Sequence, residues 1–274
     1  MNRYRFDKEE HVHFLDETPL MGTSTVCKII GKGEALSWFA SAEACKMLGW
    51  SKSKVWIDGK YSPIPFKERA PKATAMLRKL RTMKTKEYLG LLDEAYKSHD
   101  RVKREAAKVG TDRHALLETY VKHCMAEHGG APYKDLNEPI QNFIDWAQVN
   151  IRKFLWSEIH GFSEALWTGG IADVGWEDME GRVVAGDFKS SKEAYFDQFV
   201  QVAGYHTMLA ENGGYTADGD KIFTLEREPE AYCIVPFGAP QFQPAVLHEI
   251  AGMKEAFKAA VNLTKLKNQL FKET

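Results

Sequence analysis

The chain has 274 residues, of which 44% are hydrophobic and 27% are charged, and its formal net charge is −1. This length suffices for one large or two modest domains with an apolar core. The balanced charge neither demands nor excludes nucleic acid, so any such contact must come from a local basic patch. No apolar run approaches membrane-spanning length and the first residues form no signal peptide, so we expect a cytoplasmic protein without a membrane partner.

The first 49 residues predict short elements behind a polar lead-in. Residues 1–22 are interpreted as that lead-in, with a β-hairpin, and Thr23 or Ser24 is suited to cap a short helix. Residues 34–48 predict a second helix, which Gly49 closes. This region is interpreted as a helical cap on the core, with direct DNA contact as the alternative.

A basic run follows. Residues 50–71 contain glycine and three prolines, which predicts a loop, and residues 72–128 are mostly helical by pattern. The basic residues are Lys67, Arg69, Lys72, Arg78, Lys79, Arg81, Lys84 and Lys86, and Arg101, Lys103, Arg104 and Lys108 extend them. Such a run is either a solvated face or a surface that holds a phosphate backbone.

Two acidic residues and a histidine precede the central strands. His114 and Glu118 are four residues apart, so they share one face of the predicted helix. Residues 137–156 predict another amphipathic helix, and Glu158 is expected to open the first strand of the sheet. Each of the three has a structural alternative: a core histidine, a residue that only orients its neighbours, and a partner for a structural arginine.

Residues 166–189 predict a β-hairpin with a polar turn near Glu180. Asp173 and Asp187 are each seven residues from this turn, so we expect them to lie opposite each other, on one face, roughly 5 Å apart. Lys189 is two residues beyond Asp187 and projects from the same face.

This set of charges suits phosphodiester hydrolysis. Two carboxylates at that distance repel by on the order of 3 kcal/mol, and a divalent cation turns the repulsion into attraction. The cation activates water and the lysine orients the nucleophile or stabilises the transition state. A solvated hairpin with a surface Asp–Lys pair is the alternative.

The C-terminal third completes the predicted fold. A helix is expected over residues 193–211, where Gln198, Gln201 and Tyr205 form one stripe of amide and phenol groups. Two edge strands are expected at residues 222–225 and 231–235, and a closing helix at residues 244–272. The order predicts an α/β fold with a mixed central β-sheet flanked by helices.

Four of these segments together resemble a known family. GGIAD (residues 169–173) and GDFKSS (residues 186–191) resemble motifs II and III of the PD-(D/E)XK nuclease superfamily. G-x-x-x-H-x-x-x-E at residues 110–118 and Q-x-x-x-Y at residues 201–205 resemble motifs of its RecB-like exonuclease branch. More loosely, residues 19–38 resemble the N-terminus of phage RecB-like exonucleases and of the mitochondrial genome maintenance exonuclease.

The resemblance implies a restriction-endonuclease-like core at residues 99–274 behind a helical, DNA-binding region at residues 1–98. The metal would be Mg²⁺ or Mn²⁺, held by His114, Asp173, Asp187 and the carbonyl of Phe188, with Lys189 assisting the attacking water. The strand being cut would contact Gln201, Tyr205, Ser190 and Ser191, and weaker candidates are Glu118, Glu158 and Gln198. Some RecB-like nucleases carry an iron–sulfur cluster on bunched cysteines, but the four cysteines here are far apart, so no cluster is expected.

The function implied is a metal-dependent DNA exonuclease in replication, recombination or repair, acting on single-stranded or duplex ends. A recombinase, single-strand-binding protein or helicase is the kind of partner expected, and the N-terminal resemblance favours a phage-encoded enzyme in a bacterial host. The alternatives are a structure-selective endonuclease and a non-catalytic DNA-binding protein that retains the fold. No P-loop or G-x-G-x-x-G spacing supports a nucleotide-binding enzyme.

Overall fold

The computed structural model describes residues 2–31, 33–57, 60–126, 138–238 and 242–270. The chain divides into two compact units: Met1–Gly31 with Val109–Thr274, here called the sheet unit, and Lys32–Lys108, here called the inserted unit. This differs from the expected division at residue 98, because the first 31 residues pack with the sheet. The expected helix ends at His128 and Asn137 lie outside the described residues.

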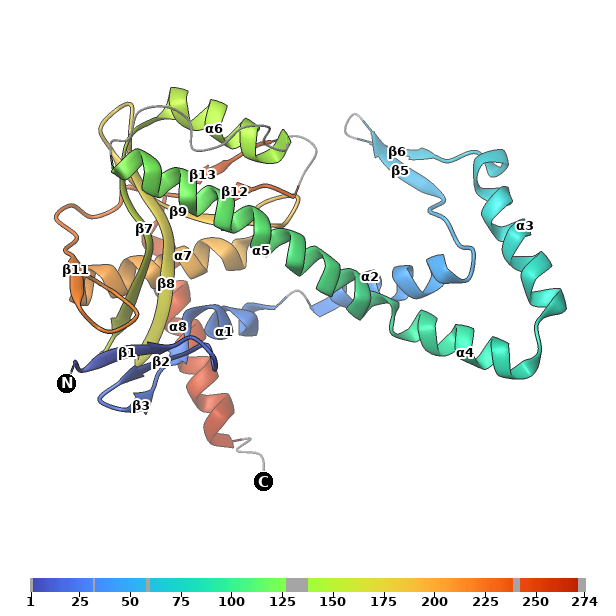
Figure 1. Cartoon of the computed structure of the whole chain (residues 1–274), viewed down its shortest axis with the longest axis horizontal. Coiled ribbons are helices and arrows are strands. Elements are labelled where there is room, and N and C mark those ends of the chain that lie inside the picture. The colour runs from blue at the N-terminus through green and yellow to red at the C-terminus, as the bar shows by residue number, and fades with distance from the viewer. Residues whose placement is uncertain (1, 32, 58–59, 127–137, 239–241, 271–274) are drawn as a thin grey trace. The chain divides into compact units, whose positions relative to one another are not determined.

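An eight-stranded mixed sheet is the centre of the sheet unit (Figure 1). Its strands are β4 (Met21–Gly22), β7 (Ile151–Ser163), β8 (Thr168–Asp178), β9 (Val183–Lys189), β10 (Gly214–Tyr215), β11 (Lys221–Phe223), β12 (Ala231–Pro236) and β13 (Ala245–Leu247). The order is β11–β10–β7–β8–β9–β12–β13, and β4 pairs with β8. β7, β8 and β9 are antiparallel neighbours, whereas β12 runs parallel to β9. The α/β class with a mixed sheet flanked by helices is therefore confirmed.

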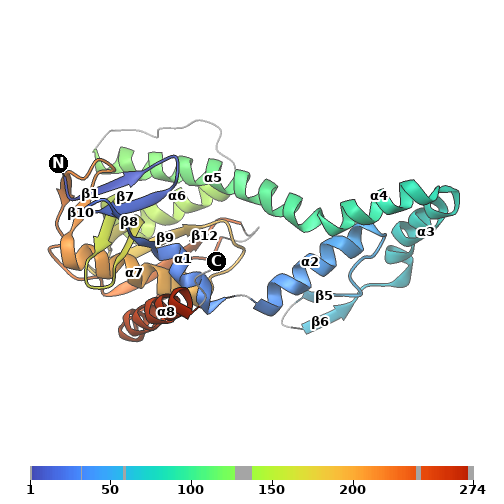
Figure 2. The same cartoon turned by 90° about the horizontal axis from the view of Figure 1, so that it is seen from below.

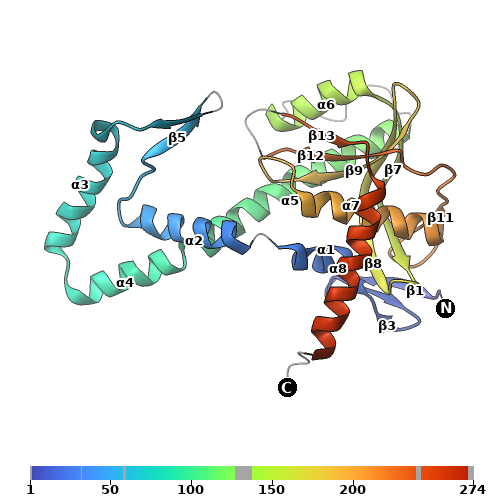
Figure 3. The same ribbon diagram turned by 180° about the vertical axis from the view of Figure 1, so that it is seen from behind.

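Helices bury both faces of this sheet (Figures 1 and 3). They are α1 (Thr23–Cys27) with the short 3₁₀ helix η1 (Lys28–Ile30), α5 (Ser98–Met125), α6 (Glu138–Asn150), α7 (Phe196–Asn212) and α8 (Ala251–Leu270). α1, α7 and α8 form one core, which includes Met208 and Phe257. α5 and α6 form the other, which includes Leu117 and Phe143. The two cores hold the central strands rigidly between them.

The N-terminal hairpin is confirmed. β1 (Tyr4–Asp7), β2 (Val12–Leu15) and β3 (Thr18–Pro19) form a small antiparallel sheet. The expected side-chain cap is wrong, because Gly22 is the N-cap of α1 and makes no such bond. Thr23 is buried instead, and its hydroxyl donates to the carbonyl of Gly169 at 3.0 Å.

The inserted unit is built from α2 (Gly33–Met47), β5 (Lys54–Ile57), β6 (Lys60–Pro63), α3 (Phe66–Thr82) and α4 (Thr85–Tyr96), all visible in Figure 2. The expected loop at residues 50–71 is wrong, because it contains the β5–β6 hairpin and the start of α3. Pro65 is the N-cap of α3, and Pro71 is tolerated inside the helix at an exposed position. Pro65 therefore marks the start of a helix here rather than a loop.

Three further boundaries differ from expectation. The helix expected to reach residue 156 ends at Asn150, and β7 begins directly after it, so Glu158 lies inside a strand rather than at its start. β12 is not an edge strand, because β9 and β13 flank it, whereas β11 is at an edge. The closing segment begins as strand β13, and α8 starts only at Ala251.

Candidate functional site

Three acidic residues lie in a row across the middle of the sheet. In the register of β7 with β8, the pairs Ser157–Val174 and Ile159–Ala172 flank Glu158 and Asp173, and in that of β8 with β9 the last pair, Val174–Gly186, directly adjoins Asp173 and Asp187. The register of β8 with β9 is the one that the equal spacing about Glu180 predicts. Asp187 is fully buried and Asp173 is 9% exposed. Buried carboxylates this close together repel each other strongly, so positively charged groups are needed nearby to stabilise them.

Helix α5 supplies the first cationic group. Nε2 of His114 is 2.9 Å from Oδ2 of Asp173 and 3.7 Å from Oε1 of Glu158. Burial alone would lower the pKa of His114, but the hydrogen bond to Asp173 and the neighbouring carboxylate charges raise it to about 9. Burial likewise would raise the pKa of Asp173, but the bonds from His114 and from the Phe188 amide, which donates at 3.0 Å, help hold it below its ordinary value.

Strand β9 supplies the second cationic group. Lys189 forms an ion pair with Oδ2 of Asp187. Burial and the charge of Asp173 raise the pKa of Asp187 to about 7, although Lys189 opposes this. Burial alone would lower the pKa of Lys189, but the charges of the two aspartates raise it, so its side chain is an ammonium donor.

Glu158 reaches the site through an unusual backbone. Its φ is 50°, a left-handed conformation that costs a non-glycine residue of order 1 kcal/mol or more within a strand. Burial and the charge of Asp173 raise its pKa to about 8, with His114 opposing. Three atoms that could bind a metal lie within 4.8 Å of one another: a carboxylate oxygen of Glu158, a carboxylate oxygen of Glu118 and a ring nitrogen of His114. Glu118 also pairs with Lys122 at 2.5 Å, so it is shared between this cluster and a helix-surface ion pair.

These residues fit a hard divalent cation. Among the described residues, Oε1 of Glu158 and Oδ1 of Asp187 are buried and accept no hydrogen bond. Buried acceptor oxygens without donors are the groups that Mg²⁺ or Mn²⁺ takes as ligands, with an imidazole added more readily to Mn²⁺. The residues present therefore fit a divalent cation, and its identity as Mg²⁺ or Mn²⁺ stays a prediction.

A cavity of about 350 Å³ opens beside this row. Its lining includes these residues predicted from the sequence: His114, Glu158, Asp173, Phe188, Lys189, Gln201 and Tyr205. The amide of Gln201 donates to the hydroxyl of Tyr205, and burial with the nearby aspartates raises the pKa of that phenol well above 10. The phenol is thus a neutral hydroxyl at the cavity wall.

Five predicted residues do not line this cavity in the described structure: Glu118, Asp187, Ser190, Ser191 and Gln198. Gln198 accepts a bond from the amide of Tyr195 and donates to Ser191, so it completes the capping box of α7. Ser191 donates in turn to the carbonyl of Glu193. Ser190 lies against α5, where a Cβ added at Gly110 would be 3.0 Å from its own Cβ. These local contacts compete with the expected substrate contacts of Ser190, Ser191 and Gln198, which stay predictions.

Two glycines of β8 let the surrounding elements come close to the acidic row. A Cβ at Gly170 would lie 2.8 Å from Oγ1 of Thr23 and 2.9 Å from Cε1 of Tyr205. A Cβ at Gly169 would lie 2.6 Å from that of His13. The GG pair is thus needed for packing and not for a turn.

The sequence analysis missed the N-terminal part of the cavity wall. The residues concerned are His11, His13, Thr23, Ser24 and Thr25. His13 is 5% exposed, and its Nδ1 is 2.6 Å from the hydroxyl of Tyr4. For Thr23, Ser24 and Thr25 the looser pattern over residues 19–38 is the available signal, and it predicts a helical cap or, as the alternative, direct DNA contact.

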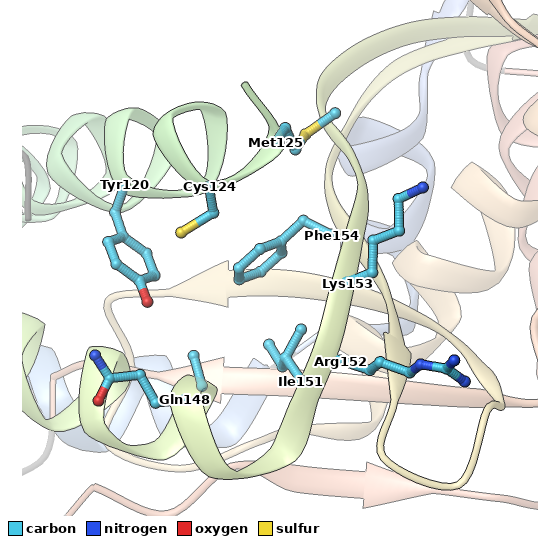
Figure 4. A pocket seen from close by; sticks show the side chains of 9 residues that line it. Tyr120, Cys124, Met125, Gln148, Ile151, Arg152, Lys153 and Phe154 are labelled. Atoms are coloured by element: carbon cyan, nitrogen blue, oxygen red, sulfur yellow. The ribbon is translucent and has the colours of Figure 1, made fainter. Parts of the chain in front are cut away.

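A second cavity, of about 480 Å³, lies between α5, α6 and the start of β7 (Figure 4). Tyr120, Cys124 and Phe154 point into it, whereas Arg152 and Lys153 point away. No acidic residue lines it among those described, so it lacks the groups for metal chemistry.

Neither the models of known protein families nor the curated proteins gave a match to this chain. Within the described residues, the helices are all too short or too polar to cross a membrane.

Proposed function

We propose that this chain is a metal-dependent nuclease of the RecB-like branch of the PD-(D/E)XK superfamily, and that it hydrolyses DNA from its ends. The observation that carries the proposal is the β8–β9 hairpin beside His114: Asp173, Lys189 and His114 line one cavity, and the buried Asp187 forms an ion pair with Lys189. The order of these residues along the chain matches the order of the motifs in that branch. A mixed sheet flanked by helices is also the kind of core that the resemblance implies.

In this proposal Asp173, Asp187, His114 and the Phe188 carbonyl hold Mg²⁺ or Mn²⁺. When bound, the ion supplies Lewis acidity and lowers the pKa of water. Glu158 adds a further carboxylate to the same cluster.

The remaining groups position the reactants. The Lys189 ammonium donates hydrogen bonds that orient the attacking water and offset charge on the phosphate oxygens. The hydroxyl of Tyr205 and the amide of Gln201 donate to the strand being cut. The water oxygen forms a bond to phosphorus, one bridging P–O bond breaks, and the proton of the water leaves with the new alcohol.

The test is degradation of end-labelled linear single-stranded and duplex DNA beside a closed circle, with Mg²⁺, Mn²⁺ or EDTA. We expect metal-dependent loss of linear DNA only. Lys189→Ala should reduce the rate by about 10²-fold or more, because a preorganised charge at the reacting phosphate is removed. Lys192→Ala, an exposed lysine outside the cavity, is the matched control.

Each other outcome has a defined meaning. Cutting of the closed circle would indicate an endonuclease. DNA binding without cleavage under either metal would leave a binding protein that retains the fold. Roles in replication, recombination or repair, a recombinase, single-strand-binding or helicase partner, and a cytoplasmic, phage-encoded setting all depend on the exonuclease outcome.

A further inference from the structure

Charge is divided between the two units of the chain. The inserted unit holds 18 lysines and arginines against nine aspartates and glutamates, a net charge of +9. The rest of the chain holds 19 against 29, a net charge of −10. The overall charge of −1 therefore conceals a strongly basic module, whose potential attracts polyanions.

Exposed aromatic side chains gather in the same unit. Seven aromatic residues are exposed among the described part of the chain, and six belong to the inserted unit: Trp38, Trp50, Tyr61, Phe66, Tyr88 and Tyr96. Phe66 is 81% exposed, and Trp38 and Tyr96 are each 76% exposed. Large rings normally bury most of their surface, so such a set indicates a surface that is covered by a ligand or partner.

Helix α3 shows how basic and aromatic groups combine. Arg69, Ala70, Met76 and Leu80 are its partly buried positions and mark the inner side. Lys67 and Arg78 are 11 residues apart, which returns them to one exposed side of a helix with 3.6 residues per turn, and the exposed Arg81, three residues on, borders that side. Phe66 is the first residue of α3 and directly precedes Lys67. The exposed surface of α3 thus offers three cations, with an aromatic ring at its N-terminal end.

The positive charge and the exposed aromatic rings together indicate what kind of molecule binds this unit. A second copy of this unit is disfavoured, because two surfaces of +9 repel each other. An acidic protein would satisfy the cations but gives no reason for the exposed rings. Single-stranded nucleic acid uses both, since its phosphates pair with Lys and Arg and its unpaired bases stack on aromatic side chains.

We propose that residues 32–108 form a module that binds single-stranded nucleic acid, with Lys67, Arg78 and Arg81 on phosphates and Phe66 stacked on a base. The inference deepens the nuclease function proposed above and rests on it for its purpose, since it names the form of strand that the chain holds. Its test is separate, because binding is measured without cleavage.

The first experiment uses the full chain in EDTA and a fluorescein-labelled oligothymidylate of about 30 nucleotides, long enough for several stacked bases. Anisotropy titrations are repeated from about 50 to 200 mM salt. The triple variant Lys67→Gln, Arg78→Gln, Arg81→Gln should lower the slope of log K against log salt by about 2, at roughly 0.7 per phosphate contact. Its matched control is Lys221→Gln, Lys258→Gln, Lys267→Gln, three exposed lysines of the sheet unit, which should leave the slope unchanged.

The second experiment separates stacking from charge. Phe66→Ala should weaken oligothymidylate binding about tenfold, leave the salt slope unchanged, and leave binding to a duplex of equal length unchanged. Leu263→Ala, also an exposed apolar truncation, is the control. Because all these side chains are exposed, circular dichroism should show folded variants.

Three results would overturn the inference: no binding of oligothymidylate at low salt, equal effects of the variant and control triples, or a Phe66→Ala variant that binds single strands as the wild type does. Binding to vesicles of phosphatidylglycerol but not to the oligonucleotide would assign the surface to a lipid instead. None of these bears on cleavage with Mg²⁺ or Mn²⁺, which reports on the nuclease function alone.

Discussion

Asp187 is fully buried beside a second carboxylate, and its Oδ1 accepts no hydrogen bond among the described residues. Lys189 pairs with Oδ2 but leaves the other oxygen without a donor. An apolar or amide side chain would be easier to bury at this position. The carboxylate is therefore best explained by what binds there and not by its contribution to the fold.

Asp187→Asn should consequently stabilise the metal-free protein while it removes metal binding. The amide relieves the repulsion from Asp173, and we expect the free energy of unfolding in EDTA to rise by about 1–2 kcal/mol. Excess Mn²⁺ should raise the melting temperature of the wild type, because an ion that binds only the folded state stabilises it, but not that of the variant. Asp145→Asn, at an exposed position of α6, is the control that should respond to Mn²⁺ as the wild type does. An equal response of all three proteins would show that Asp187 holds no metal.

His13 gives a prediction for the dependence of stability on pH. Burial and, to a smaller extent, the charges of His160 and His11 lower its pKa from 6.5 to about 3. The unfolded chain takes up a proton below pH 6.5 that the folded chain does not bind, so stability falls as the pH falls from 6.5 toward 3. His13→Gln removes this group, and the wild type should lose roughly 1.5 kcal/mol more than the variant between pH 6.5 and 5. Urea unfolding at both pH values measures the difference, and parallel losses would show that His13 titrates normally in the fold.

At this scale the sequence predicted the residues that are related by local geometry. The proximity of Asp173 and Asp187 is predicted from their equal spacing about one turn. The position of Lys189 on the same face as Asp187 is predicted from the alternation of side chains along a strand. His13 and Thr23 reach the cavity from a distant part of the chain, and no local spacing connects them to β8. Likewise the local bonds of Gln198 and Ser191 compete with substrate contacts, and residue type alone does not decide between these uses.

At the scale of elements, the boundary between α6 and β7 shows why patterns fail. Phe143, Ala147, Ile151 and Phe154 continue one helical spacing, and no glycine or proline separates them. Pairing with β8 overrides this pattern from Ile151 onward, because Ile151 and Phe154 enter the same core as Phe143 and Ala147 from a strand as well as they would from a helix. The hairpin of β8 and β9 needs no such distant partner, which is why its position was predictable.

Gly170 gives the prediction that belongs to this scale. Gly170→Ala places a methyl group 2.8–3.1 Å from Thr23, Tyr205 and Met208, so α1 and α7 must move away from β8. We expect a loss of about 1–3 kcal/mol in the free energy of unfolding, as for other overpacked cores. Gly90→Ala, in α4, meets no atom within 4 Å and should instead gain up to about 1 kcal/mol through helix propensity. Denaturant midpoints of both variants test the pair, and a neutral effect at Gly170 would contradict the tight packing of β8.

At the scale of the whole molecule, the two units differ in how much they bury. Among the described residues of the inserted unit, the buried ones are Gly49, Leu91, Ala95 and Ser98, whereas α7 alone buries nine residues of the sheet unit. The division into units was not predictable from composition, because the average charge and hydrophobicity of the chain hide two modules of opposite sign. Only contacts between the first 31 residues and the sheet reveal where the insertion begins.

This difference predicts a gradient of stability along α5, whose first part to Lys108 belongs to the inserted unit and whose remainder belongs to the sheet unit. Amides protected by few buried contacts exchange through local opening, whereas those in a packed core require opening of that core. Hydrogen exchange should therefore be about 100-fold slower in α7 than in α3. Within α5 it should slow between residues 98–108 and 109–125, where Leu117 and Val121 become buried. Uniform protection along α5 and in α3 would show instead that the inserted unit unfolds only together with the sheet.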